Sequence, residues 1–317
     1  MTTENDYSHI NTIISLLPSH ISGALSRLSK SVLDKTEEIR LRSNAVATVT
    51  VSGECCVLCE SGMTKKSTNP LTTSAEDIED FIYRFCKGSV YSYEASLSDF
   101  YITIGSVRVG ISGQAIIKNG VISGVGSIYS VNIRIPRHID GCARNVVEHI
   151  ARYGFPDGKG ILIASAPGQG KTTLLRDLAK SLSLCTGKSE LTPIYKVCVI
   201  DERNEIYMDN VFCFCCADFL TATGKVKGIE IASRVLSPQI IVCDEIGSAE
   251  EAEKIRLQKN SGTVFIASVH ADSIEAIMKK EYLKRMYDEG VFGYTYLLSR
   301  KNGTFSGIMT EYQDKNA

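Results

Sequence analysis

The chain has 317 residues and a formal net charge of −1, and 44% of its residues are hydrophobic while 22% are charged. This length is enough for two domains that each bury a core, and the balanced charge lacks the basic bias of a nucleic-acid-binding protein. No apolar run reaches the roughly 20 residues that a membrane-spanning helix needs.

Eleven cysteines are a high number for this length. Their odd count and the polar N-terminus, which does not resemble a signal peptide, argue against a secreted disulfide framework. We therefore expect a cytoplasmic protein whose cysteines act as small hydrophobic residues. As an alternative, Cys56-x-x-Cys59 and Cys213-x-Cys215 offer zinc ligands, although the alternating apolar residues over 211–216 favour a packed strand.

The first 140 residues predict an α+β domain of their own. Apolar residues recur there first at helical spacing, around Pro18, and then at the alternating spacing of strands. Thr73 or Ser74 is expected to cap a helix that runs through Phe85, with acidic residues in its first turn. The predicted elements, in order, are helices within 1–37, strands within 37–51, the capped helix, hairpins within 101–111 and 115–123, and an extended segment over 130–137.

The second predicted domain, residues 141–317, reads as an α/β P-loop NTPase fold. A helix over 142–153 leads into an apolar strand over 160–164, and three further apolar strands each end in polar residues. Strands that are apolar throughout belong in a parallel sheet covered on both faces, whose carboxyl edge holds the chemistry. These strands cover 197–200, 240–243 and 264–269, with helical segments at 174–184 and near 228–236, 249–259 and 273–287. The last residues, 313–317, read as a frayed tail.

A phosphate-binding loop connects the strand over 160–164 to the helix over 174–184. Glycines let its backbone turn N–H groups toward an anion, the helix N-terminus adds partial positive charge, and the lysine reaches the outer phosphates. The predicted nucleotide-binding residues are Pro167, Gly168, Gln169, Gly170, Lys171, Thr172 and Thr173. Ser165 stands where the usual motif, G-x-x-x-x-G-K-[ST], has its first glycine, and we expect it to be tolerated if its φ is negative.

Three strand ends supply further candidate site residues. Asp244 and Glu245 follow an apolar strand as a Walker B element does, so that Asp244, with Thr172, would bind magnesium and Glu245 would polarise water. Glu202 is a second candidate base, with Arg203 as a phosphate contact. His270 could hydrogen-bond near the γ-phosphate. The simpler alternatives are a helix-capping acidic pair, a solvated turn and a buried structural histidine.

Arginines near the predicted site could reach the nucleotide of a neighbouring subunit. A guanidinium group suits phosphate charge, and one supplied in trans would act as an arginine finger. The candidates are Arg134, Arg137 and Arg234, of which Arg234 immediately precedes the Walker B strand.

With these motifs in order, the chain resembles the type II/IV secretion-type ATPases and, within them, the stage III sporulation protein AA family of spore-forming Firmicutes. The landmarks run almost from end to end, and their order is more specific than any single motif. They are residues 37–42, 108–111, 132–135, 167–177, 201–205, 237–239, 244–247 and 289–292. Ser165, the Asp272-Ser273 pair and the high cysteine content depart from the family pattern.

The resemblance implies a RecA-like ATPase core behind an N-terminal domain, and a ring, expected to be a hexamer, that uses ATP and Mg²⁺. It places Glu202 in the so-called Asp box and His270 in the His box. It also implies a protein in the mother cell, peripheral to the membrane, that powers a channel complex of membrane-embedded sporulation proteins shared with the forespore.

Other functions remain open from the residues alone. A nucleotide-gated nucleic-acid-binding protein is the main alternative, although the chain has neither an aromatic RNP-like stretch nor a long Lys/Arg block. A GTPase is disfavoured because the Asn-Lys-x-Asp guanine-reading tetrad is missing from the sequence. A metabolite kinase is the remaining possibility, without a readable substrate pocket.

Overall fold

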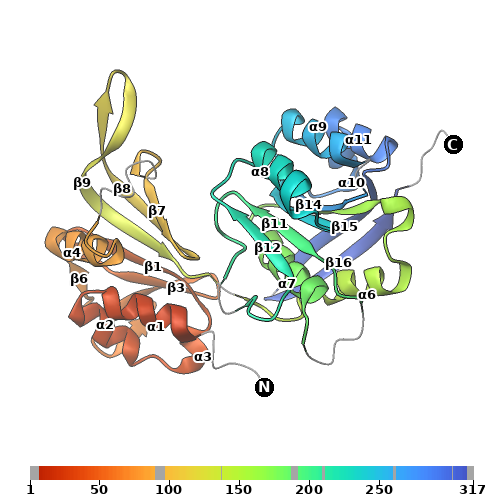
Figure 1. Ribbon diagram of the computed structural model, residues 1–317. Helices are drawn as coiled ribbons and strands as arrows, with labels where there is room; N and C mark the ends of the chain where they lie inside the picture. Colours follow the sequence, from red (N-terminus) through yellow and green to blue (C-terminus); the bar gives the residue numbers. More distant parts are fainter. Residues whose placement is uncertain are drawn as a thin grey trace. The chain divides into compact units, whose positions relative to one another are not determined.

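A computed structural model describes residues 7–89, 97–136, 138–186, 192–208, 211–259, 262–301 and 303–312. The chain forms two compact units, residues 1–137 and 138–317, which are coloured red to yellow and green to blue in Figure 1. The expected tail over 313–317 and the candidate Arg137 lie outside the described residues.

The first unit is a seven-stranded antiparallel sheet with helices packed on it (Figure 1). The strand order is β5-β4-β3-β1-β9-β8-β7, and a small second sheet pairs β2 with β6. Its elements are α1 (Tyr7–Leu16), α2 (Ser19–Ser26), α3 (Lys30–Leu33), β1 (Thr36–Arg42), β2 (Ala45–Val46), β3 (Thr48–Val51), β4 (Glu54–Cys59), β5 (Gly62–Thr64), β6 (Thr72–Thr73), α4 (Ala75–Phe85), β7 (Tyr101–Ile104), β8 (Val107–Lys118) and β9 (Val121–Arg134).

Local sequence signals explain the main features of this unit. Pro18 separates α1 from α2. Ser74 caps α4 as predicted, since its hydroxyl accepts from the backbone N–H of Asp77, whose carboxylate accepts from the N–H of Ser74. Asn119 and Gly120 both have positive φ, which suits the tight turn between β8 and β9. These two strands form one long hairpin, where the sequence predicts shorter strands.

The second unit is built on a seven-stranded sheet of order β12-β11-β13-β14-β10-β15-β16. Every neighbouring pair is parallel except β15 with β16. Its elements are α6 (Arg144–Tyr153), η2 (Pro156–Gly158), β10 (Gly160–Ser165), α7 (Lys171–Ser183), β11 (Val197–Asp201), β12 (Ala217–Thr221), α8 (Lys225–Ile231), η3 (Ala232–Leu236), β13 (Ile240–Glu245), α9 (Ala249–Gln258), β14 (Val264–His270), α10 (Ile274–Met278), α11 (Glu281–Asp288), β15 (Phe292–Lys301) and β16 (Thr304–Glu311).

Both faces of this sheet are covered, as the apolar strands predict. Side chains alternate across a strand, and in β10 Ile161 and Ile163 join the core formed with α6 and α7, whereas Leu162 and Ala164 join the core beneath α8 to α11. Figure 1 shows these two helical layers on opposite faces of the sheet. Burial on both faces leaves the strand ends as the place where polar side chains reach solvent.

The secondary structure of this unit differs from the predictions in three places. Residues 211–216 form turns rather than a packed strand, and the strand β12 follows them. The helical segment near 273–287 is two helices, because Lys280 has an extended backbone between α10 and α11. β15 and β16 have no counterpart among the predicted elements.

Two further predictions concern the state of the cysteines and the lack of a membrane-spanning helix. All eleven cysteines are free thiols, and Cys198 and Cys243 are fully buried in the sheet as small hydrophobic residues. Neither proposed zinc group brings together three ligand-type side chains within the described ranges. In the same ranges we find no helix with the length and apolarity to cross a membrane.

Candidate active site

The predicted phosphate loop joins the C-terminal end of β10 to the N-terminus of α7. Gly168 and Gly170 have φ values of 75° and 94°, a conformation that L-residues other than glycine rarely adopt. Ser165, by contrast, is buried in extended strand backbone, and its hydroxyl donates to the carbonyl of Ala166 at 2.9 Å. The position that is usually glycine therefore does not need a left-handed backbone in this chain.

The hairpin of β15 and β16 supports this loop from the side. Gln169 Oε1 accepts from the backbone N–H of Arg300 at 2.9 Å. The ring of Phe305 lies against Gly170, so close that a Cβ at this position would be 2.7 Å from the ring. Gln169, predicted as a nucleotide contact, thus fixes the loop to its own sheet in this structure, and Gly170 is needed for space as well as for φ.

A line of three polar side chains crosses the strand ends behind the loop. Lys171 Nζ is 2.7 Å from His270 Nδ1, and His270 Nε2 is 3.2 Å from Glu245 Oε2. An ammonium group can only donate and a carboxylate can only accept, so His270 accepts at Nδ1 and carries its proton on Nε2. The histidine therefore connects the loop lysine to the Walker B glutamate.

The strand order explains why these three residues meet. β14, which ends in His270, lies between β10 and β13, which end in Ser165 and Glu245. Parallel strands present their carboxyl ends at one edge, so residues distant in sequence converge there. His270 lies at the same strand edge as Lys171 and Glu245, with 38% of its side chain exposed, so it is not a fully buried core histidine.

Lys171 is nearly buried, with 8% exposure. Burial lowers the pKa of its ammonium group, while the negative charges of Glu245 and Asp244 oppose that shift. Lys171 Nζ also lies 3.5 Å from the carbonyl oxygen of Ser165. The loop lysine is thus a desolvated cation that faces two carboxylates.

The donor set beside Lys171 fits a nucleotide with magnesium. Asp244 Oδ1 accepts from the Ser268 hydroxyl at 3.2 Å, which fixes its carboxylate at the strand end, and Thr172 occupies the first turn of α7. Hydroxyl and carboxylate oxygens are the ligands that Mg²⁺ prefers. A Cβ at Gly168 would meet no atom within 4 Å, so the loop leaves open space there for an anion.

The charged cluster after β11 divides into a structural part and an exposed part. Asp201 is fully buried, and its carboxylate accepts from the backbone N–H groups of Glu205, Ile206 and Tyr207, each at 2.8 Å. Glu202 and Arg203 are exposed. Asp201 therefore shapes the turn that presents Glu202.

Two buried basic residues that the sequence analysis did not single out organise the same region. Arg176, on α7, donates to the carbonyl oxygens of Glu205 and Ile206 and so ties the turn after β11 to the loop helix. Lys225 lies between Glu202 and the end of β13. Burial of a cation among carboxylates is a signal that only the fold supplies, since both residues look like ordinary surface positions in the sequence.

Of the described candidate arginines, Arg234 belongs to the unit that holds this group. It lies on the short π-helix η3, where its Nη1 pairs with Glu230 Oε1 at 2.9 Å. Arg134 lies at the end of β9, in the other unit. Neither the ion pair of Arg234 nor the position of Arg134 on β9 tests whether these arginines contact a nucleotide bound by a second copy of the chain.

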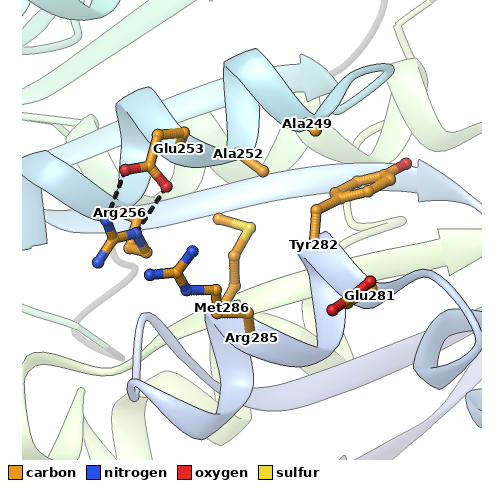
Figure 2. Close-up of a pocket in the computed structure, with 8 residues that line it drawn as sticks. All are labelled: Ala249, Ala252, Glu253, Arg256, Glu281, Tyr282, Arg285 and Met286. Atoms are coloured by element: carbon orange, nitrogen blue, oxygen red, sulfur yellow. Dashed lines mark hydrogen bonds and ion pairs between the residues drawn. The ribbon is translucent and has the colours of Figure 1, made fainter.

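A pocket of about 330 Å³ opens between α9 and α11 (Figure 2). Its walls combine Ala252, Met286 and Tyr282 with the ion pair of Arg256 and Glu253. Burial raises the pKa of Tyr282, and the charges of Glu251 and Glu245 raise it further. None of the predicted site residues lines this pocket.

One further cluster has the composition of a cation site. His138 Nε2 is 2.8 Å from Asp140 Oδ1 and 4.0 Å from Asp177 Oδ1. Lys180 Nζ lies 2.6 Å from Asp140 Oδ1, so an ammonium group already supplies the positive charge. This network ties the start of the unit to α7.

Comparison with known proteins agrees with this reading of sequence and fold. The family model described as "Sporulation stage III, protein AA" matches residues 8–316. Stage III sporulation protein AA of Bacillus subtilis (strain 168) is 32% identical over 319 aligned residues, which cover 97% of this chain and 96% of the relative.

Solved structures show the fold at much lower identity. The ATPase DotB of Yersinia pseudotuberculosis is 15% identical, with a TM-score of 0.60, and the match covers 97% of this chain and 79% of that one. The pilus retraction motor PilT, solved with bound ADP, is 12% identical with a TM-score of 0.56, over 90% and 82% of the two chains. These likenesses show that the architecture is that of a P-loop ATPase fold.

Proposed function

This chain belongs to the sporulation stage III, protein AA family, and from that membership we propose that it is a magnesium-dependent ATPase of the secretion-motor type. The observation that carries the proposal is the line from Lys171 through His270 to Glu245 beside the loop of Gly168 and Gly170. A loop lysine and a carboxylate that orients water are groups that P-loop NTPases use for γ-phosphate hydrolysis, and His270 lies between them.

The chain's own residues divide the work of hydrolysis. The N–H groups of the loop and of the first turn of α7 hold the phosphates, and Lys171 turns from His270 toward their outer oxygens. The carboxylate of Glu245 accepts a hydrogen bond from the attacking water and so orients it. Thr172 and Asp244 would hold magnesium, which, when bound, neutralises charge on the β- and γ-phosphate oxygens.

His270 makes this site responsive to the nucleotide. When Lys171 leaves Nδ1 for a phosphate, the imidazole loses the donor that fixes its orientation, while its Nε2 is the atom that lies 3.2 Å from Glu245 Oε2. Arrival of the outer phosphate is thereby transmitted to the carboxylate that orients water. The histidine thus acts as a link between binding and hydrolysis.

We extend the proposal to the assembly. A hexameric ring in which Arg234 completes the site of the next subunit, and which drives membrane-embedded sporulation channel proteins from the mother-cell side, accords with the family and with the fold shared with DotB and PilT. Arg234 lies on the π-helix η3, shortly before the Walker B strand β13, and 77% of its side chain is exposed to such a contact.

The first test is magnesium-dependent ATP hydrolysis by the wild-type protein and by Lys171→Ala. Loss of the loop cation should lower turnover by about 10²- to 10³-fold and weaken nucleotide binding. Lys284→Ala is the matched control, because Lys284 is an exposed lysine that pairs with Asp288 on α11. Full turnover by Lys171→Ala would contradict the site.

Light scattering with and without ATP tests the ring separately. We expect nucleotide to promote a species of about six times the 34.7 kDa chain. An active monomer would preserve the ATPase proposal and remove the ring.

A further inference from the structure

We propose that Lys225 is a positioning residue that holds the end of the Walker B strand so that Glu245 faces His270; this inference rests on the proposed ATPase function. Lys225 is the first residue of α8, and its side chain is only 5% exposed. A lysine so deeply buried requires anionic or carbonyl partners, because desolvation of an unpaired ammonium group costs several kcal/mol.

The side chain of Lys225 contacts Glu245 and Glu202 of the candidate site and Glu251 of helix α9. Its Nζ donates to the backbone carbonyl of Glu245 and to Glu251 Oε2, the latter at 3.2 Å. Glu202 Oε2 lies 3.8 Å from the same atom, as an ion pair. One ammonium group therefore touches the backbone of one candidate base and the carboxylate of the other.

The backbone that Lys225 holds is irregular. Between β13 and β14, Cys243 pairs with Ala267 and Glu245 with Ser268, so Asp244 is an extra residue in the ladder. A bulge of this kind redirects side chains and interrupts regular pairing. It allows Asp244 and Glu245 to take separate directions, but it leaves the strand end with fewer backbone restraints.

Two other contacts complete the restraint. Ile246 N–H donates to the carbonyl of Ser268 at 2.8 Å, and Gly247 N–H donates to Glu251 Oε2 at 2.8 Å. Because Glu251 Oε2 also accepts from Lys225, one lysine–glutamate pair holds the segment at Glu245 and at Gly247, on either side of Ile246. Removal of the ammonium group should therefore release the Glu245 carboxylate from its 3.2 Å approach to His270.

Lys225 also accounts for the position of Glu202. The turn shaped by Asp201 brings the exposed Glu202 within 3.8 Å of the buried ammonium group of Lys225. In this arrangement Glu202 offsets the charge of Lys225, while Glu245 remains directed at His270. The two glutamates thus have different partners, although either has the chemistry of a general base.

The test uses the full chain with Lys225→Met, which keeps the length of the side chain and removes its charge. Lys227→Met is the matched control, since Lys227 lies two residues along α8 with its side chain 67% exposed. Two readouts are needed: the imidazole ¹⁵N signals of His270, assigned with His270→Gln, and kcat and KM for MgATP.

We expect Lys225→Met to shift the Nε2 signal of His270 and to lower kcat on the order of 10²-fold, as misplacement of a catalytic group does, with KM close to that of the wild type. Lys227→Met should change neither. Should Lys225→Met not fold, Glu251→Gln removes the anchor of Lys225 and should produce the same signal shift with a smaller loss of kcat.

The outcomes separate this inference from the proposed function. An unchanged His270 signal and an unchanged kcat in folded Lys225→Met overturn the positioning role, and equal losses in kcat and in nucleotide affinity indicate a merely structural lysine. A wild-type protein without turnover, in which the His270 signal still depends on Lys225, overturns the ATPase proposal and leaves the positioning role supported.

Discussion

Two glutamates near the phosphate loop have carboxylates that could activate water, and their surroundings differ. Glu245 lies 3.2 Å from His270 Nε2 with 30% of its side chain exposed. Glu202 lies 3.8 Å from Lys225 with 44% exposed. A general base must lie within hydrogen-bond reach of the reacting groups, and of the two glutamates Glu245 is the one that contacts His270, the hydrogen-bond partner of Lys171.

We therefore predict that Glu245→Gln slows ATP hydrolysis by at least about 10²-fold while nucleotide binding is retained, because the amide keeps the size of the side chain and loses its basicity. Glu202→Gln should cost much less. Single-turnover rates with equilibrium binding measure the two effects, and Glu250→Gln, an exposed glutamate of α9, is the control. A larger loss in Glu202→Gln would move the base to the turn after β11.

At this scale the sequence indicates the residue types better than their contacts. Lys171, Asp244, Glu245 and His270 all follow apolar strands, and the parallel sheet brings their strand ends to one edge. Lys225 could not be found in this way, because nothing local distinguishes it from Lys227, two residues on. Its burial depends on the distance between α8 and the turn after β11, which is a tertiary property.

Among the elements, the turn after β11 shows how one buried side chain shapes a functional loop. The carboxylate of Asp201 accepts from three consecutive backbone N–H groups of the turn, those of Glu205, Ile206 and Tyr207. Burial raises the pKa of Asp201 more than these hydrogen bonds lower it, and the charge of Asp244 raises it further. The Asp201 carboxyl group therefore binds a proton more tightly in the folded protein than in the unfolded chain.

From this shift we predict how Asp201→Asn changes stability with pH. Between about pH 4 and the raised native pKa, the folded wild type binds more protons than the unfolded chain, so its unfolding free energy falls as pH rises through that window. Asp201→Asn lacks this slope and has one acceptor oxygen fewer. We expect it to be about 1–3 kcal/mol less stable than the wild type, with a deficit that grows as pH is lowered through the window.

Denaturant unfolding of both proteins between pH 4 and pH 7 measures this difference. Asp218→Asn, at an exposed position of the neighbouring strand β12, is the control and should show no such pH dependence. A deficit that shrinks toward low pH would mean that the three hydrogen bonds outweigh burial, and that the native pKa lies below the unfolded value.

Residues 211–216 and the two edge strands show where the sequence pattern failed to predict the structure. Apolar residues alternate over 211–216 as in a strand, yet this segment forms turns. Phe212 is buried there because its ring packs on that of Phe219 in β12, with the ring centroids 4.6 Å apart. The strands β12 and β16 lie at the two edges of the sheet, where half-exposed residues weaken the apolar pattern. The central strands β10, β11, β13 and β14 were predicted well because burial on both faces makes them apolar throughout, whereas β15 was missed although it lies inside the sheet and is mostly buried.

For the whole molecule, the important property is that each unit buries a core of its own. One core is built entirely from residues 10 to 133 in the first unit. Two others fill the opposite faces of the second sheet, and their members lie between residues 143 and 298. Domains with separate cores can in principle fold alone, and Lys171, Asp244, Glu245 and His270 of the proposed nucleotide site all belong to the second unit.

We predict that the two units unfold in separate transitions. Leu41→Ala in β1 and Leu283→Ala in α11 each remove a side chain with 0% exposure, one from each unit. Each substitution should lower the unfolding free energy of its own unit by about 2–5 kcal/mol and leave the other transition unchanged. MgADP should stabilise only the transition that Leu283→Ala affects, since a ligand stabilises the unit that binds it. Calorimetry of the wild type and both variants, with and without MgADP, measures all of these effects. If both substitutions and the nucleotide shift one common transition, the units fold as a single cooperative body, and the assignment of the nucleotide site to an independent unit is wrong.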